Sequence, residues 1–241
     1  MRAVIVIPAR YGSTRFPGKP LVPIAGVSLI ERVYRRAVAS TRAEAVYVAT
    51  DDDRIFAHVT GFGGKVVQPE GDFQSGTDRI AAALPIIETL EQQRFDAIVN
   101  VQGDEPLIDI ASVDALIDLL AAGAEIATLA SPLETDEELH ARDVVKAVVD
   151  VQDVALYFSR AAIGSRGEAL RHIGVYAYRR QALETFVSLP PSPLERAESL
   201  EQLRALQHGM RIAVSRTPRP HLGVDRPEDV ERVERELAKH R

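Results

Sequence analysis

The chain has 241 residues, of which 46% are hydrophobic and 27% charged, and its formal net charge is -6. This composition favours one large domain, residues 1–241, with its own buried core. Because the net charge leaves no basic surplus and the basic residues are scattered along the chain, we expect no nucleic-acid partner. The absence of cysteine excludes disulfides and thiolate metal sites. We find neither a membrane-spanning apolar run nor a signal-like segment, and therefore expect a cytoplasmic protein without a membrane anchor.

Apolar segments rich in Val and Ile alternate with amphipathic segments along the chain. The apolar segments are typical of buried strands, and the amphipathic ones repeat apolar residues at helical spacing. In chain order we predict strand 3–7, helix 29–39, strands 45–49 and 65–67, helix 77–90, strand 97–101, helix 110–122, strands 126–129, 144–149 and 212–214, and helix 228–238. This order predicts an α/β fold built on a doubly wound, mostly parallel Rossmann-like sheet.

The order is less regular after residue 144. Strand-like segments at residues 155–159 and 171–179 flank a short glycine-containing stretch at 163–167. We interpret residues 144–180 as a small antiparallel extension of the main sheet. We also expect this extension to take part in forming a homodimer.

The first strand leads into a loop, residues 8–20, that contains three cations, Arg10, Arg15 and Lys19. The carboxyl end of a strand in an open α/β sheet is a common ligand site. Glycines, hydroxyls and cations together suit a triphosphate. A solvated polar loop is the alternative, because the sequence has neither a Walker A motif nor a G-x-G-x-x-G pattern.

Acidic residues follow another predicted strand. Asp104 and Glu105 come after the apolar residues 99–101, and Asp225 lies far along the chain before the last helix. Carboxylate oxygens beside a triphosphate are typical ligands of Mg²⁺. The alternatives are an acidic turn for the first pair and a helix N-cap for Asp225, which precedes Pro227.

Several longer strings carry a family resemblance. Residues 8–10 and 15–19 resemble the signature of nucleotide-sugar pyrophosphorylases and cytidylyltransferases. Further strings resemble the cytidylyltransferases that activate 3-deoxy acid sugars, in the order of that family, and they lie at residues 74–79, 100–106, 155–160, 171–176, 191–195 and 200–204. The resemblance covers residues 4–234.

The resemblance implies a role for each matching residue. The nucleotide would be bound by Ala9, Arg10, Ser13, Arg15, Lys19, Ser75, Arg79 and Gln102. Mg²⁺ would be held by Asp104 and Asp225, which with Lys19 and Arg10 form the implied catalytic group. The acid sugar would be bound by Arg160, His172, Tyr176, Glu201 and Gln202. Half-buried strand residues and a solvated helix face are the alternatives for this last set.

The implied reaction transfers CMP from CTP to the anomeric hydroxyl of 3-deoxy-manno-octulosonate (Kdo) and releases pyrophosphate, for lipopolysaccharide biosynthesis. The alternatives are the same chemistry on an amino-substituted Kdo or another acid sugar, and a non-catalytic nucleotide-binding homologue. The stretch at 163–170 is shorter than in the family pattern. We therefore expect weak sugar binding that tolerates changes at the far end of the sugar.

Overall fold

The computed structural model describes residues 1–12, 16–218 and 222–239. Its chain divides into two compact units. Unit 1 takes residues 1, 96–98 and 112–220, and unit 2 takes residues 2–95, 99–111 and 221–241. The expectation of a single domain stays a prediction.

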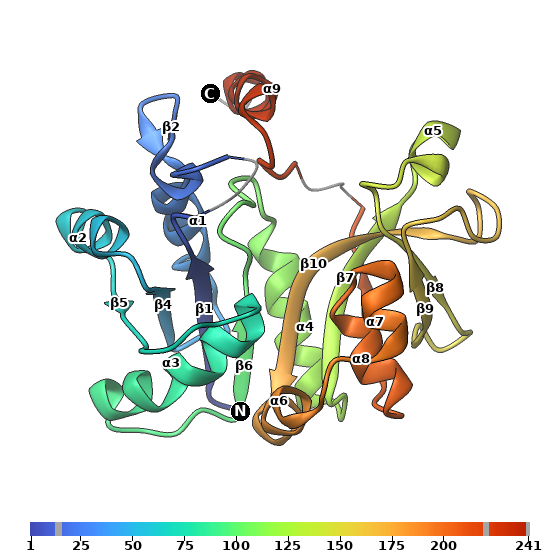
Figure 1. Ribbon diagram of the computed structural model, residues 1–241, viewed down its shortest axis with the longest axis horizontal. Helices are drawn as coiled ribbons and strands as arrows, with labels where there is room; N and C mark the ends of the chain where they lie inside the picture. Colours follow the sequence, from blue (N-terminus) through green and yellow to red (C-terminus); the bar gives the residue numbers. More distant parts are fainter. Residues whose placement is uncertain (13–15, 219–221, 240–241) are drawn as a thin grey trace. The chain divides into compact units, whose positions relative to one another are not determined.

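Unit 2 contains a sheet whose neighbouring strands follow the order β6-β1-β4-β5 (Figure 1). Pairing is parallel between β1 and β4 and between β4 and β5. The elements of this unit are β1 (Ala3–Ala9), η1 (Lys19–Leu21), β2 (Pro23–Ile24), β3 (Val27–Ser28), α1 (Leu29–Ala37), β4 (Ala45–Thr50), α2 (Asp53–Gly61), β5 (Val66–Val67), α3 (Gly76–Glu91), the end of β6 (Ala97–Asn100) and α9 (Pro227–Ala238). The apolar strands β1 and β4 are buried along almost their whole length, which explains their unbroken runs of Val, Ile and Ala.

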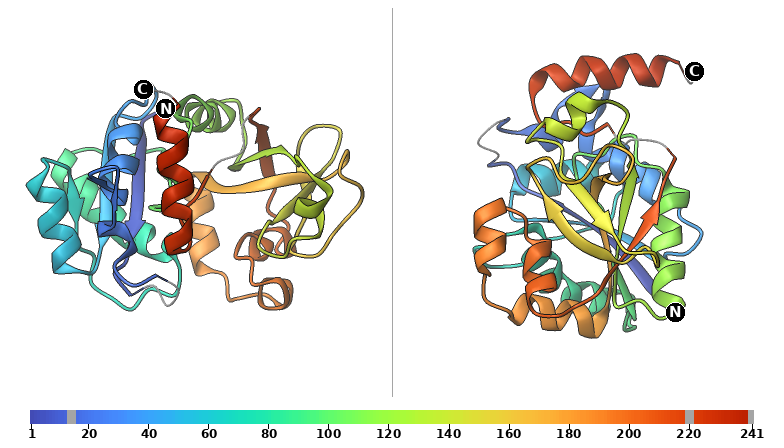
Figure 2. Two further views of the ribbon diagram at one scale, coloured as in Figure 1. Left: turned by 90° about the horizontal axis from the view of Figure 1, so that it is seen from above. Right: turned by 90° about the vertical axis from the view of Figure 1, so that its right-hand side faces the viewer.

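Unit 1 combines one parallel strand pair with an antiparallel region. Strand β7 pairs parallel with β11 and antiparallel with β10, while β8 pairs antiparallel with β10 and β9 (Figure 2). The elements of this unit are α4 (Ile110–Ala121, from its third residue), β7 (Ile126–Pro132), α5 (Asp136–His140), β8 (Lys146–Val149), β9 (Ala155–Ser159), β10 (Leu170–Arg179), α6 (Arg180–Ser188), α7 (Pro193–Glu198), α8 (Gln202–Gln207) and β11 (Ile212–Arg216).

The predicted α/β fold, with a mostly parallel sheet and a small antiparallel extension, is confirmed. Each predicted strand and long helix is present, with ends that differ by a few residues. The sequence reasoning did not predict α2, α5, α6 or α7 as helices. These are short segments, and apolar periodicity is hard to recognise over so few residues. Within the described ranges, no helix has the length and hydropathy needed to cross a membrane.

Candidate active site

A polar pocket of about 250 Å³ lies in unit 2, at the carboxyl ends of β1 and β6 and before α3. Most of the predicted nucleotide and catalytic residues line this pocket: Ala9, Arg10, Lys19, Ser75, Arg79, Gln102, Asp104 and Asp225. The predicted residues Ser13 and Arg15 lie outside the described part of the chain. The structure therefore gathers residues from widely separated parts of the sequence around one cavity.

Lys19 is the cation on which the two predicted metal acids converge. Its Nζ lies 2.7 Å from Oδ2 of Asp104 and 3.6 Å from Oδ1 of Asp225. The Lys19 side chain is 14% exposed and that of Asp104 is 29% exposed, so this contact is shielded more than an ordinary surface ion pair. Asp225 is more open, at 56%.

Two glycines allow the loops to bring these groups together. Gly18, just before η1, has φ +72°, a backbone conformation that favours glycine, and a Cβ there would lie 3.1 Å from the Tyr11 ring. Gly103 follows β6, and a Cβ at this residue would lie 3.0 Å from the carbonyl oxygen of Pro8. The close approach of the Gly103 loop to the end of β1 therefore depends on the missing side chain.

The interpretation of Asp225 as a helix N-cap is wrong. Helix α9 begins at Pro227 with Arg226 as its N-cap. The carboxylate of Asp229 accepts hydrogen bonds from the main-chain N–H groups of Asp225 and Arg226, both at 2.9 Å. Oδ1 of Asp225 lies 3.6 Å from Nζ of Lys19.

The donor set at this position fits magnesium. Within the described residues, no group of three or more His, Cys, Asp or Glu side chains converges as a metal site. Magnesium bound with a nucleotide, however, commonly takes only one or two carboxylates and completes its shell with phosphates and water. Asp104 and Asp225 supply two hard oxygen donors that already approach one cation, Lys19.

Arg79, in α3, is a buried cation that lines the same pocket. Its Nη2 donates to Oδ2 of Asp51 at 2.8 Å, and its guanidinium lies 5.1 Å from the centroid of the Phe73 ring. Its Nη1 is buried and has no hydrogen-bond partner in the described chain. Because a buried donor without a partner is costly, this nitrogen is well suited to bind a polar group of a ligand.

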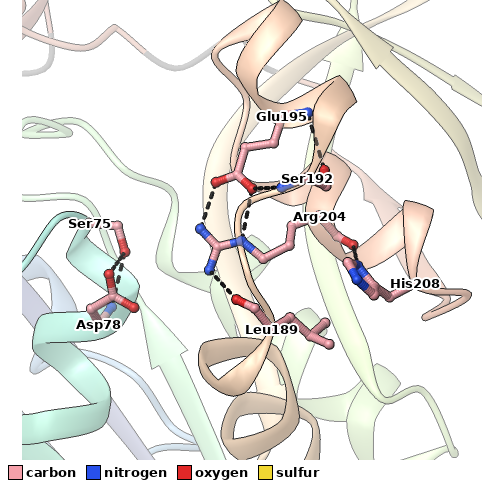
Figure 3. A network of polar contacts seen from close by, with 7 residues as sticks. All are labelled: Ser75, Asp78, Leu189, Ser192, Glu195, Arg204 and His208. Carbon is pink, nitrogen blue, oxygen red and sulfur yellow. Dashed lines mark hydrogen bonds and ion pairs between the residues drawn. The ribbon is translucent and has the colours of Figure 1, made fainter.

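Ser75 has a structural role in the same pocket. Its hydroxyl accepts from the N–H of Asp78 at 3.1 Å and donates to Oδ2 of Asp78 at 3.0 Å (Figure 3). Ser75 is thus the N-cap of α3. The Ser75 hydroxyl is therefore engaged by Asp78 at the start of α3.

In unit 1, a β-bulge brings two predicted sugar residues together. The register of β10 against β7 shifts between Ile173 and Tyr176. Within this bulge, the Thr128 hydroxyl of β7 donates a hydrogen bond to the carbonyl of Val175 at 2.8 Å. The Nε2 atom of His172 then lies 3.1 Å from the Thr128 hydroxyl and 3.0 Å from that of Tyr176.

The electrostatic environment keeps both of these side chains neutral. Burial lowers the pKa of His172 from 6.5 to about 3. Burial also raises the pKa of Tyr176 well above 10, and the nearby charges of Tyr178 and Glu201 raise it further. His172 and Tyr176 therefore act as hydrogen-bonding groups and not as acids or bases near neutral pH.

The neutral state of His172 can be measured directly. We expect its Cε1–H resonance to stay constant from pH 7.5 to pH 5, whereas the same residue in the urea-unfolded chain should titrate near pH 6.5. Because only the unfolded state gains this proton, His172 should make the free energy of unfolding fall as the pH decreases from 6.5 toward 3. A His172→Gln variant would assign the resonance, and a folded-state titration near pH 6.5 would contradict the prediction.

Two further predicted sugar residues lie at the start of α8. Glu201 is its N-cap residue, and Gln202 is its first residue. Gln202 is 8% exposed, and its Nε2 has no hydrogen-bond partner in the described chain.

A buried ion pair fixes the hairpin of helices that carries Glu201 and Gln202. Arg204 donates to both carboxylate oxygens of Glu195, at 2.6 and 2.9 Å (Figure 3). Glu195 also accepts from the N–H of Ser192 and completes the capping box of α7. Bidentate pairing of this kind defines the geometry strongly, so α7 and the start of α8 are held in a fixed relation.

Arg160 and Arg166 have different surroundings within unit 1. The Arg160 guanidinium donates to the carbonyls of Glu198 at 3.0 Å, Arg142 at 3.3 Å and Ser199 at 3.4 Å. Carbonyls orient a cation without neutralising it. Arg166 instead pairs with Asp136 at 3.0 Å, and both side chains are at least half exposed.

The sequence reasoning missed two residues that shape the pocket, Asp51 and Phe73. Asp51 follows the buried strand β4 at the same edge of the sheet as the phosphate loop, and three consecutive acids at 51–53 were a signal that could have identified it. The sequence holds no comparable signal for Phe73.

Comparisons with known proteins place the chain in a family. Residues 4–212 match the family described as cytidylyltransferase. The chain is 47% identical to a 3-deoxy-manno-octulosonate cytidylyltransferase of Syntrophotalea carbinolica, over 98% of this chain and 99% of the relative. It is 44% identical to an 8-amino-3,8-dideoxy-manno-octulosonate cytidylyltransferase of a Shewanella species, over 99% of both chains.

A solved structure gives the same result. CMP:2-keto-3-deoxy-manno-octonic acid synthetase complexed with CTP matches with a TM-score of 0.90 and 39% identity, and the match covers 100% of both chains. Similarity in sequence and in three-dimensional structure thus covers nearly the whole chain. This chain belongs to the cytidylyltransferase family.

Proposed function

We propose that this enzyme transfers CMP from CTP to the anomeric hydroxyl of Kdo and releases pyrophosphate. The observation that carries the proposal is the convergence of Lys19, Asp104 and Asp225 in a polar pocket at the carboxyl ends of β1 and β6. A cation and two hard carboxylates are the groups that nucleotidyl transfer requires. The full-length similarity to Kdo cytidylyltransferases supports the choice of both substrates.

In the proposed reaction, the anomeric oxygen forms a bond to the α-phosphorus of CTP as the bond to the pyrophosphate oxygen breaks. Arg10 and Lys19 line the pocket and would offset the charge that grows on the departing pyrophosphate. Arg79 would donate from its unpartnered Nη1 to the nucleoside part of CTP. We assign no side chain to the hydroxyl proton, which passes to solvent.

Asp104 and Asp225 would hold magnesium. When bound, this ion would act as a Lewis acid that offsets the charge of the phosphates and lowers the pKa of the attacking hydroxyl. Each carboxylate would therefore bind magnesium and also interact with Lys19.

Pyrophosphate release tests the proposal. We would measure it with CTP, ATP, GTP and UTP in turn, each with Kdo, with an 8-amino derivative of Kdo and with a neutral hexose. Release that requires both CTP and Kdo supports the function. Tight CTP binding with no release for any acid sugar would instead identify a non-catalytic nucleotide-binding homologue.

An 8-amino derivative of Kdo is a second candidate substrate. Relatives named for this sugar are 44–45% identical to the chain, almost the same as those named for Kdo. The shorter stretch at 163–170 is consistent with loose recognition of the far end of the sugar. Steady-state kinetics with both sugars would separate the candidates. A large difference in kcat/KM between them would contradict the prediction that the enzyme tolerates changes at the far end of the sugar.

Arg160→Ala should lower kcat/KM for the sugar more than Arg166→Ala does. A charged hydrogen bond to the sugar carboxylate contributes about 1.5–3 kcal/mol, or roughly 10- to 150-fold. Arg166 is half exposed and already paired with Asp136, so its loss should change kcat/KM less than about threefold. The KM for CTP serves as the internal control. A larger effect from Arg166→Ala would contradict this assignment of Arg160.

Location, assembly and pathway are further parts of the proposal. We expect a cytoplasmic homodimer whose CMP-Kdo product serves lipopolysaccharide biosynthesis. Sedimentation of the purified protein would test the dimer.

A further inference from the structure

Lys146 is a charged side chain inside the apolar strand β8 of unit 1. The residue is 0% exposed, and its Nζ donates to the carbonyls of Ala141 at 2.7 Å, Val144 at 2.6 Å and Arg160 at 2.8 Å. These bonds use the three N–H donors that an ammonium group has. Burying a charge costs several kcal/mol unless each of its N–H groups has a hydrogen-bond acceptor. The three carbonyls provide these acceptors for Lys146.

The three carbonyls belong to segments that also hold the Arg160 side chain. Val144 and Ala141 flank Arg142, whose carbonyl accepts from Nη1 of Arg160 at 3.3 Å. The main-chain carbonyl of Arg160 is itself bound by Lys146. Lys146 therefore fixes both the backbone of Arg160 and the loop against which its guanidinium rests.

Glu198, the last residue of α7, also holds the backbone at Arg160. Its Oε2 accepts from the main-chain N–H of Arg160 at 2.9 Å, and its Oε1 accepts from the Ser159 hydroxyl at 3.2 Å. Each described partner of the guanidinium is a carbonyl, and both Nη1 and Nη2 retain an N–H without a partner in the described chain. The result is an oriented cation with donors left for an anionic ligand.

We propose that Lys146 is a positioning residue for the acid sugar, because it holds the backbone and the supporting loop of Arg160 in the geometry that binds the sugar carboxylate. This inference rests on the proposed function and assigns a role to a residue that makes no contact with substrate. A displacement of about 1 Å in a binding group is enough to lower activity as much as 100-fold. Loss of Lys146 leaves three carbonyls without donors and frees this segment to shift.

The main test is Lys146→Met, which keeps the length of the side chain and removes the ammonium. We expect the KM for Kdo to rise at least tenfold while the KM for CTP stays within about twofold. Val148→Ala is the matched control, because Val148 lies on the same strand and packs against the cluster of Leu133, Leu139 and Ala169. It should lower the melting temperature and leave the KM for Kdo unchanged.

A pH profile of the unmodified enzyme tests the same point without a variant. Burial lowers the pKa of Lys146 below 10.5; Asp143 and Glu198 oppose this shift, whereas Arg142 and Arg160 add to it. A neutral amine has only two N–H donors, so one carbonyl loses its partner when Lys146 deprotonates. Lys146 should therefore lose its proton at an alkaline pH that is lower than 10.5, and the KM for Kdo of the unmodified enzyme should rise as it does so. In folded Lys146→Met the KM for Kdo should not change over the same pH range.

The outcomes separate the two proposals. If the unmodified enzyme turns over Kdo normally and folded Lys146→Met has an unchanged KM for Kdo, the positioning role is overturned alone. If Lys146→Met does not fold, a flat alkaline profile of the unmodified enzyme overturns the role. Absence of pyrophosphate release by the unmodified enzyme with CTP and Kdo would overturn the proposed function, and this inference with it.

Discussion

Asp104→Asn should lower kcat/KM for CTP roughly 100-fold, equivalent to about 2.7 kcal/mol of transition-state stabilisation. The substitution keeps the shape of the side chain but removes the charge of a proposed magnesium ligand, which lies 2.7 Å from Lys19. Asp225→Asn should act in the same direction. The circular dichroism spectrum of both variants should stay that of the unmodified protein, because both side chains line the pocket and lie outside the core.

The magnesium dependence separates two explanations of this loss. If Asp104 and Asp225 are metal ligands, the Mg²⁺ concentration at half-maximal rate should rise in each variant. If they only orient Lys19, the rate should fall with an unchanged Mg²⁺ dependence. Asp53→Asn is the matched control, since Asp53 is an exposed acid of the same unit, in the first turn of α2. Near-normal turnover of either pocket variant would contradict the role of that carboxylate.

The parts of this site that were predictable from sequence lie directly after buried strands. Apolar runs reveal β1 and β6, and polar residues at their carboxyl ends must meet at one edge of a parallel sheet. Arg10, Lys19 and Asp104 were identified in this way. Their family resemblance then supplied the specific roles.

Other features depend on contacts that sequence patterns do not specify. Asp225 and Asp229 are both acids near the start of α9, and only the structure shows that Asp229 accepts from the amides of Asp225 and Arg226. The neighbourhood of His172 and Tyr176 depends on a bulge in β10, for which Gly174 was the one visible signal.

Lys146 illustrates a similar limit. A single lysine in the apolar run 144–149 was visible, but its three carbonyl partners come from two different segments of the chain. An apolar pattern predicts the strand correctly and says nothing of how a charge inside it is satisfied. Local periodicity reports burial, whereas hydrogen-bond partners are set by tertiary structure.

Lys19→Met should lower kcat roughly 100-fold while the Kd for CTP changes less than about fivefold. The charge on the leaving pyrophosphate grows toward the transition state, so a cation beside it stabilises the transition state more than the bound substrate. Arg10→Met should act in the same direction. Single-turnover rates and calorimetric titration with CTP would measure the two quantities separately.

The position of Lys19 between two carboxylates gives this prediction a second part. Its removal leaves Asp104 and Asp225 without the cation that both approach at 2.7 and 3.6 Å. Two acids with no counter-charge attract a divalent ion more strongly, so the variant should need less Mg²⁺ for half-maximal rate. Lys65→Met, which removes an exposed lysine paired with Glu91 in the same unit, should change neither quantity. If Lys19→Met weakens CTP binding as much as it slows turnover, Lys19 binds substrate and transition state equally, and its leaving-group role is wrong.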